Sequence, residues 1–124
     1  MRTYTLGKED RLKSVVRIEK LFKTGKSFMT FPFIVYYTLE DAENYPKGQM
    51  MVSVSKHYFK HAVDRNRMKR LTREAFRLRK PTLNETIQKP YSVAFVYKSR
   101  QLESFEVVSK AMDAIMQKLS TVLV

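Results

Sequence analysis

The chain has no cysteine and no tryptophan, and its 124 residues include only 12 acidic residues against 24 Lys and Arg. The lack of cysteine excludes a disulfide framework and a metal site built on thiolate ligands. No apolar run approaches the roughly 18 residues of a membrane-spanning helix. Residues 1–7 also lack the hydrophobic core of a signal peptide. These absences favour a soluble cytoplasmic protein.

The remaining composition is that of a folded domain. Hydrophobic residues make up 44% of the chain, with eight Phe and seven Tyr, which is too apolar for a disordered basic tail. The length fits a single domain, expected over residues 1–124, and no repeat or low-complexity linker divides it. A net charge of +12 points to a polyanionic partner.

One segment carries most of this charge. Residues 56–80 hold ten Lys or Arg and two acids, or +8 of the total +12. On a helix, one arc gathers Arg65, Asn66, Lys69, Arg70, Arg73 and Arg77. The opposite side carries Met68, Leu71, Ala75 and Leu78. Like charges four residues apart cost a few tenths of a kcal/mol each, and a bound polyanion would recover that cost. The pattern therefore favours nucleic-acid binding over a charged surface kept for solubility.

The same residues also form a motif. The order Ala62-Val63-x-Arg65-Asn66-Arg67-x-Lys69-Arg70-x-x-Arg73-Glu74-x-Phe76-Arg77 closely resembles the signature of the bacterial ribonuclease P protein subunit. Two flanking positions depart from it, since Lys60 stands where the family commonly has Gly and His57 where a second Lys is usual. The resemblance implies an α+β fold, a two-layer αβββαβα sandwich with a left-handed βαβ crossover, similar to a domain of a small-subunit ribosomal protein.

The first half of the chain predicts one helix and two strands. Val15, Ile18, Leu21 and Phe22 recur at helical spacing between a candidate N-cap, Ser14, and Gly25. Residues 31–39 and 49–55 predict strands that pair as a hairpin across the polar turn 40–48. Alternation places Phe33, Val35 and Tyr37 on one side of the first strand, and Ile34 and Tyr36 on the other.

The second half predicts a helix, a strand and a helix. The basic helix ends in a loop over residues 81–90, which is bounded by two prolines. The nearly unbroken apolar run 91–97 is typical of a central strand buried on both faces, parallel to the strand 49–55. Residues 104–123 predict a helix that covers the sheet, with Ser104 as N-cap.

No arrangement of residues predicts catalysis by the chain itself. Glu40, Asp41 and Glu43 share one turn, expected to be flexible and solvated, which makes a metal site improbable. His57 and His61 are four residues apart, but no third ligand completes a zinc site, so we interpret them as surface or phosphate-contacting histidines. The resemblance implies that a catalytic RNA cleaves the substrate with bound Mg²⁺, and we expect no cofactor on the protein.

The resemblance also implies two binding surfaces, one for the catalytic RNA and one for the 5′ leader of precursor tRNA. The motif residues that bind RNA are Arg65, Asn66, Arg67, Lys69, Arg70, Arg73 and Arg77. Supporting contacts are expected from Lys56, Lys60, Arg11 and Lys13. The leader cleft is expected to contain Ile18, Phe22, Phe33 and Tyr36, since aromatic faces stack on unpaired bases. For any one of these aromatics, burial in the core is an equally good interpretation.

Other functions remain open from the residues. A ribosomal-type protein that binds rRNA would share the fold and charge, and a DNA-binding regulator would place the basic helix in the major groove. A metal-dependent nuclease or a lipid-binding helix is favoured less. Phe76 falls on the basic side of the predicted helix, and could tuck under the last helix or stack on RNA. Arg65 and Arg70 point away from the apolar stripe, so replacing either with Ala is expected to weaken RNA binding without changing the fold.

Overall fold

The computed structural model describes residues 11–12, 15–40 and 48–123. Its elements in chain order are α1 (Val15–Thr24), β1 (Lys26–Thr30), β2 (Phe33–Leu39), β3 (Gln49–Val54), α2 (Ala62–Thr86), β4 (Tyr91–Tyr97) and α3 (Phe105–Val122). The strands form one four-stranded sheet in the order β1-β2-β4-β3. This mixed fold confirms the α+β class and the αβββαβα order.

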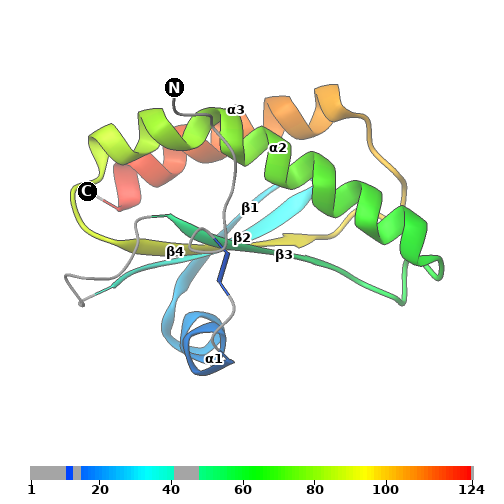
Figure 1. Ribbon diagram of the computed structural model, residues 1–124, viewed down its shortest axis with the longest axis horizontal. Coiled ribbons are helices and arrows are strands. Elements are labelled where there is room, and N and C mark those ends of the chain that lie inside the picture. Colours follow the sequence, from blue (N-terminus) through cyan, green and yellow to red (C-terminus); the bar gives the residue numbers. More distant parts are fainter. Residues whose placement is uncertain (1–10, 13–14, 41–47, 124) are drawn as a thin grey trace.

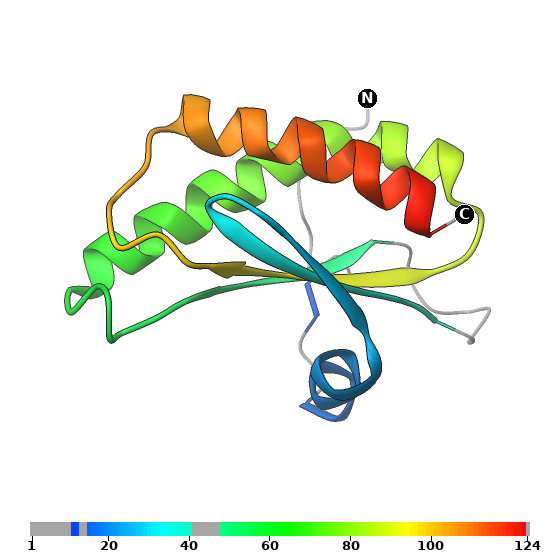
Figure 2. The ribbon, with the colours of Figure 1, turned by 180° about the vertical axis from the view of Figure 1, so that it is seen from behind.

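The two faces of the sheet are covered unequally. Helices α2 and α3 lie side by side across one face, and α1 lies on the other (Figures 1 and 2). The sheet with α2 and α3 is the predicted two-layer sandwich. Because α1 has only ten residues, it covers a small part of the second face.

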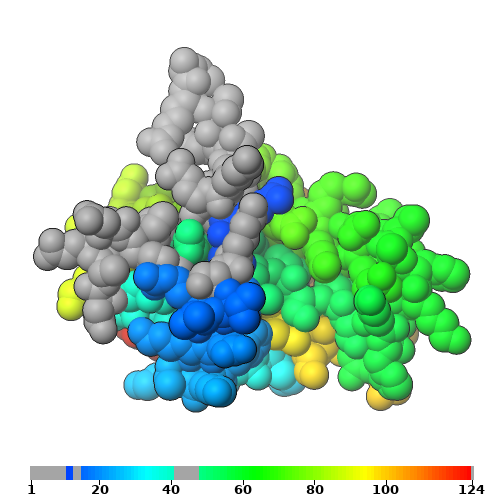
Figure 3. All heavy atoms as spheres, turned by 60° about the horizontal axis from the view of Figure 1, so that its bottom comes forward, coloured from blue at the N-terminus to red at the C-terminus, as the bar shows by residue number. Residues whose placement is uncertain are grey.

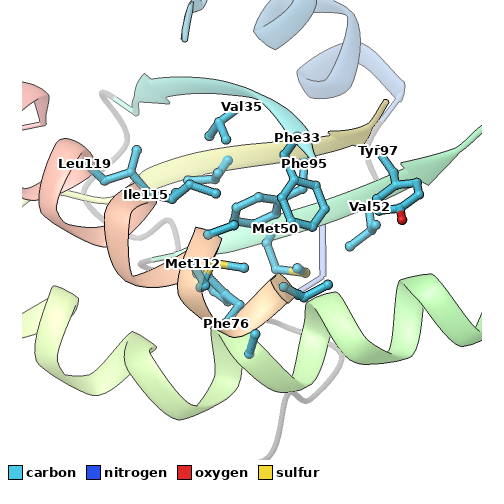
Figure 4. Packing of buried hydrophobic residues seen from close by; sticks show 14 of the residues in the cluster. Phe33, Val35, Met50, Val52, Phe76, Phe95, Tyr97, Met112, Ile115 and Leu119 are labelled. Carbon is cyan, nitrogen blue, oxygen red and sulfur yellow. The ribbon is translucent and has the colours of Figure 1, made fainter. Parts of the chain in front are cut away.

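The main core fills the space between the sheet and the α2–α3 pair. Alternate residues of β2 point into this core, where Phe33 and Val35 are fully buried and Tyr37 and Leu39 partly buried (Figure 4). Phe76 of α2 is also fully buried, with its ring 5.6 Å from that of Phe95 in an edge-to-face contact. The question that the sequence left open for Phe76 is thus answered, because its ring belongs to the core.

Strand β4 lies in the centre of the sheet, as its apolar sequence predicts. It pairs antiparallel with β2 and parallel with β3. The predicted hairpin between β2 and β3 is therefore wrong, because β4 lies between them. A strand with apolar residues on both faces would leave much of that apolar surface in contact with water at the edge of a sheet. The central position buries both faces, so β4 lies there with β2 and β3 on either side.

Strand β1 is the true hairpin partner of β2, joined to it through Phe31 and Pro32. The residues alone did not reveal β1, although the resemblance implied a third strand before the long helix. The sequence Lys-Ser-Phe-Met-Thr is half polar because β1 is an edge strand that pairs on one side only. The strand predicted to start at Phe31 instead begins at Phe33.

Helix α2 runs past the residue where we expected it to end. Pro81 lies inside the helix, which continues to Thr86, so the predicted loop over residues 81–90 is mostly helical. The proline ring removes one backbone hydrogen bond. Leu83 and Ile87, one helical turn apart, are 3% and 1% exposed, and their burial offsets that loss.

The ends of the two shorter helices agree with the sequence. Helix α1 ends just before Gly25, where a Cβ atom would lie 2.3 Å from the carbonyl oxygen of Leu21, so only glycine fits. Helix α3 follows Ser104, whose hydroxyl accepts a hydrogen bond from the N–H of Val107 at 3.3 Å.

Candidate nucleic-acid interface

The N-terminal half of α2 presents several cations that no described residue neutralises. Within the described part of the chain, no hydrogen bond or ion pair occupies the side chains of Arg67, Lys69, Arg70 and Arg73. Asn66 is exposed beside them. Like charges in one row repel one another when no opposite charge is near. The binding of phosphates to this surface relieves that repulsion and is therefore favoured.

Two other arginines of α2 bind within the protein. Arg77, which belongs to the motif, donates through Nε to Glu74 Oε2 at 3.0 Å, and this hydrogen bond lowers the pKa of the Glu74 carboxyl. Arg79 joins α2 to α3 through Asp113 Oδ1 at 2.7 Å and Ser109 Oγ at 2.6 Å. The charge of Arg77, unlike those of Arg67, Lys69, Arg70 and Arg73, is thus paired with a carboxylate among the described residues.

Arg11 extends this surface beyond the helix. It forms a parallel bridge with Met50 on the outer edge of β3, next to the N–H of Leu12, which donates to the Met50 carbonyl at 2.9 Å. The pKa of Arg73 is lowered mainly by partial burial and to a smaller extent by the positive charge of Arg11. Arg73 remains protonated, because the ordinary pKa of an arginine is far above neutral pH. Two guanidinium groups from distant parts of the sequence therefore face the same region.

The remaining supporting residues fall into two groups. Lys56 and Lys60 are exposed on the segment between β3 and α2, and no other described residue forms a hydrogen bond or ion pair with their ammonium groups. Lys13 lies outside the described residues.

Arg65 differs from its neighbours because it holds the chain that leads into α2. Its Nη1 donates to the carbonyl oxygens of Phe59 at 2.8 Å and Lys60 at 3.1 Å. These bonds count against the expectation that Arg65→Ala leaves the fold unchanged. The buried side of α2 includes Thr72 and Phe76 rather than Leu78, which is 49% exposed, and this rotation brings Arg65 to the margin of the core.

Replacing Arg65 and Arg70 should separate these roles. We expect Arg65→Ala to lower the free energy of unfolding by about 1–2 kcal/mol, because two carbonyl groups lose a charged donor. Arg70→Ala should change it by no more than about 0.5 kcal/mol, as is usual for a free surface side chain. Urea unfolding of both variants measures the difference, and equal stabilities would contradict the structural role of Arg65.

A second surface lies on the α1 face of the sheet. The ring of Phe22 on α1 meets that of Tyr36 on β2 edge to face, with centroids 4.7 Å apart, and Phe22 is 38% exposed. Ile18 packs beside Tyr36 against the buried residues Leu21 and Ala94. Three of the predicted cleft residues, Ile18, Phe22 and Tyr36, are therefore brought together.

Phe33 does not belong to this group. It is fully buried on the opposite face of the sheet, where its ring lies 5.9 Å from Phe95 and 5.7 Å from Tyr97. Its assignment to the leader cleft is wrong, because residues an odd number of positions apart in a strand point to opposite faces. The alternation that separates Phe33 from Tyr36 was already visible in the sequence.

The α1 face stays partly open beyond the helix. The strand register places Ile34, Val96 and Ser53 in one row across β2, β4 and β3. This row lies next to the row that α1 covers, and its three residues are half-buried. Figure 3 shows α1 in blue and the approach to α2 in green on this same side of the molecule, with the end of β4 between them. This row therefore leaves part of the sheet accessible beside α1.

Acidic and histidine residues do not form a metal centre in the described ranges, where no group of three potential ligands occurs. Glu40 is buried and bonded to Arg17 and Ser92, so the expectation of a solvated carboxylate is wrong, while Asp41 and Glu43 lie outside the described residues. His57 precedes α2 and His61 is its N-cap, so the two do not share a helix face.

The surroundings of α2 also bear on the DNA-binding alternative. A helix-turn-helix needs a helix joined to the recognition helix by a tight turn. Here β3 is the element before α2. No described helix is long and apolar enough to cross a bilayer.

Comparisons with known proteins agree with this arrangement. Residues 6–120 match the family described as Ribonuclease P. The ribonuclease P protein component of Porphyromonas gingivalis is 40% identical over 114 residues, covering 90% of this chain and 83% of that protein. The component of Clostridioides difficile is 32% identical over 108 residues, covering 86% and 89%.

Solved structures share the fold. The RNase P protein of Staphylococcus aureus superposes with a TM-score of 0.73 at 22% identity, over 93% of this chain and 98% of that one. The RNase P protein of Thermotoga maritima gives a TM-score of 0.62 at 26% identity, over 91% and 94%. Together with the match over nearly the whole sequence, these similarities show that the chain belongs to the ribonuclease P protein component family.

Proposed function

We propose that this subunit of the tRNA-processing ribonucleoprotein binds the catalytic RNA through the basic face of α2 and the 5′ leader of precursor tRNA through the α1 face. Family membership gives the chain a role in an endoribonuclease complex. The observation that carries the proposal is a set of cations on one helix that have no partner among the described residues: Arg67, Lys69, Arg70 and Arg73. The proposal places the protein in the cytoplasm with its RNA partners.

The α2 face acts by charge and by geometry. Guanidinium groups donate two parallel hydrogen bonds to a phosphate, so Arg67 and Arg70 can each fix one backbone position. Asn66 can both donate and accept, which suits a base edge or a 2′-hydroxyl. These contacts offset the repulsion between RNA strands where the catalytic RNA and the precursor tRNA meet.

The α1 face suits a single strand of any sequence. The half-exposed Phe22 and the adjoining Tyr36 offer aromatic surface, and stacking of a base on such a ring contributes about 1–3 kcal/mol without selecting the base. We propose that the leader lies on the open row beside α1, with Ile18 adding apolar contact. Ile18 stands where the family often has Phe, so it supplies no stacking.

Bond breaking belongs, in this proposal, to the RNA and its Mg²⁺ ions. Phosphodiester hydrolysis needs metal-bound water or a positioned acid and base. Some of the described carboxylates are paired with arginines, as Glu40 is with Arg17 and Glu74 with Arg77, and no three potential metal ligands gather among the described residues. We propose that the protein itself holds no metal and lowers the Mg²⁺ concentration that the RNA requires.

Reconstitution tests this function. A bacterial ribonuclease P RNA at low Mg²⁺ should cleave the 5′ leader of precursor tRNA only after this protein is added, because the added cations replace part of the screening by Mg²⁺. The RNA alone at high Mg²⁺ is the control for an active RNA. Cleavage by the purified protein freed of nucleic acid, or no stimulation of an RNA that is active in the control, would contradict the proposal.

A further inference from the structure

Glu40 is the only charged residue buried in the described part of the chain, with 2% of its side chain exposed. Its Oε2 accepts a hydrogen bond from Arg17 Nη1 on α1 at 2.8 Å. Its Oε1 accepts one from Ser92 Oγ on β4 at 3.1 Å, and its N–H donates to the carbonyl of Pro90 at 2.8 Å. The carboxylate is therefore bonded to β4 through one oxygen and to α1 through the other, while the backbone of Glu40 is held beside the start of β4.

Stability alone does not explain a carboxylate at this position. Moving two charged groups out of water costs about as much free energy as their attraction inside the protein recovers. A protein with an apolar pair of similar volume at the same place is often equally stable. A hydrogen bond depends on the angle between donor and acceptor as well as on their distance, whereas an apolar contact does not. The bond between Arg17 and Glu40 therefore allows one relative orientation of the two side chains. The property that the pair adds is thus a defined position for α1.

The contacts of α1 show why such a constraint is needed. The C-terminal end of the helix is held by the chain, since Gly25 leads into β1 and Lys26 pairs with Tyr37. Its other described anchors on the sheet are mainly apolar, Leu21 fully buried and Ile18 partly. Apolar contacts are non-directional and leave the helix free to roll or slide. Arg17 supplies the directional contact in the N-terminal half.

We propose that Glu40 is a positioning residue for substrate recognition, which through Arg17 sets where α1 lies above the sheet and so where the ring of Phe22 stands. Phe22 follows Arg17 by five residues on the same short helix, and its ring contacts Tyr36 at a centroid distance of 4.7 Å. A shift of α1 changes the aromatic surface offered to a base. This inference rests on the proposed contact of the leader with Phe22 and Tyr36.

Glu40→Met tests the proposal, because it replaces the carboxylate with an uncharged side chain of similar length and leaves Arg17, which is one-third exposed, able to reach water. The holoenzyme is reconstituted with each variant, and its affinity is measured for precursor tRNA with a single-stranded leader and for tRNA without one. The ratio of the two affinities, which is the leader contribution, should fall by about fivefold to tenfold, roughly the value of one weakly stacked base. Affinity of the protein for the catalytic RNA should stay within about twofold.

Three further variants make the result specific. Glu19→Met removes the same charge from an exposed position of α1 and should leave the ratio unchanged. Arg17→Lys keeps a donor and should retain part of the leader contribution. The double variant Arg17→Met and Glu40→Met buries no unpaired charge, so it should fold. Its leader contribution should fall no further than that of Glu40→Met alone, as expected for two residues that act as one unit.

The outcomes distinguish the two proposals. A wild-type holoenzyme that binds both tRNAs equally would overturn the leader contact and the role of Glu40 with it. A wild-type leader preference that survives in folded Glu40→Met and in the double variant would overturn the role of Glu40 alone. Equal losses in Glu19→Met and Glu40→Met would also overturn it, because charge rather than position would then explain the effect.

Discussion

Phe33→Ala is expected to lower the free energy of unfolding by about 3–5 kcal/mol, the usual cost of removing a buried phenyl ring. The ring is fully buried and packs edge to face against Phe95 and Tyr97. A domain of this size is stable by about 5–15 kcal/mol in total, so the variant should unfold at a much lower urea concentration. Circular dichroism during urea titration measures this shift.

Phe22→Ala is the matched control for that experiment. Phe22 is 38% exposed and lies outside the main core, so its loss should cost less than about 1.5 kcal/mol. Its effect is expected instead on the affinity of the holoenzyme for a tRNA that carries a leader. If Phe33→Ala left stability unchanged and weakened only leader binding, the assignment of Phe33 to the core would be refuted.

The double variant Arg67→Glu and Arg70→Glu should show the largest effect on RNA binding. Each change removes a charged contact worth about 1.5–3 kcal/mol and adds repulsion from phosphate. Affinity for the catalytic RNA is therefore expected to fall by at least about 100-fold. Both side chains are exposed and free of partners among the described residues, so thermal stability should change little.

Salt dependence shows whether this loss is electrostatic. If the wild-type face covers about six phosphates, log K falls against log salt with a slope of about −4 to −5, and the double variant should be shallower by about 1.5. The control Lys89→Glu and Lys110→Glu alters net charge equally at exposed positions away from the motif, and should keep both affinity and slope. A control that lost as much affinity would mean that net charge alone drives binding.

The sequence predicted those elements whose signal is local. The amphipathic pattern of residues 62–80 located α2, the apolar run located β4, and Ser104 located the start of α3. Edge strand β1 lacked such a pattern because its exposed side has no need of apolar residues. The pairing of β2 with β4 depends on partners far apart in the chain, and no local pattern specifies it.

Site residues divide in the same way. Arg67, Lys69 and Arg70 could be proposed from the motif and the helical period, and no other described residue binds their side chains. The roles of Arg65 and Glu40 could not be assigned from the sequence, because they depend on carbonyl groups and side chains that only the folded chain brings close. Phe33 could have been placed correctly, since strand alternation separates it from Tyr36.

The central position of β4 determines when this protein can fold. Because β4 is the sixth of the seven described elements, β2 has only β1 beside it and β3 has no partner strand until the ribosome has released residues 91–97. In a nascent chain that stops at Pro90, the sheet is therefore interrupted at its centre, and α2 has no complete layer to cover. Folding must therefore follow synthesis of most of the chain, and the cation-rich helix emerges into a cell full of RNA before the scaffold that orients it exists.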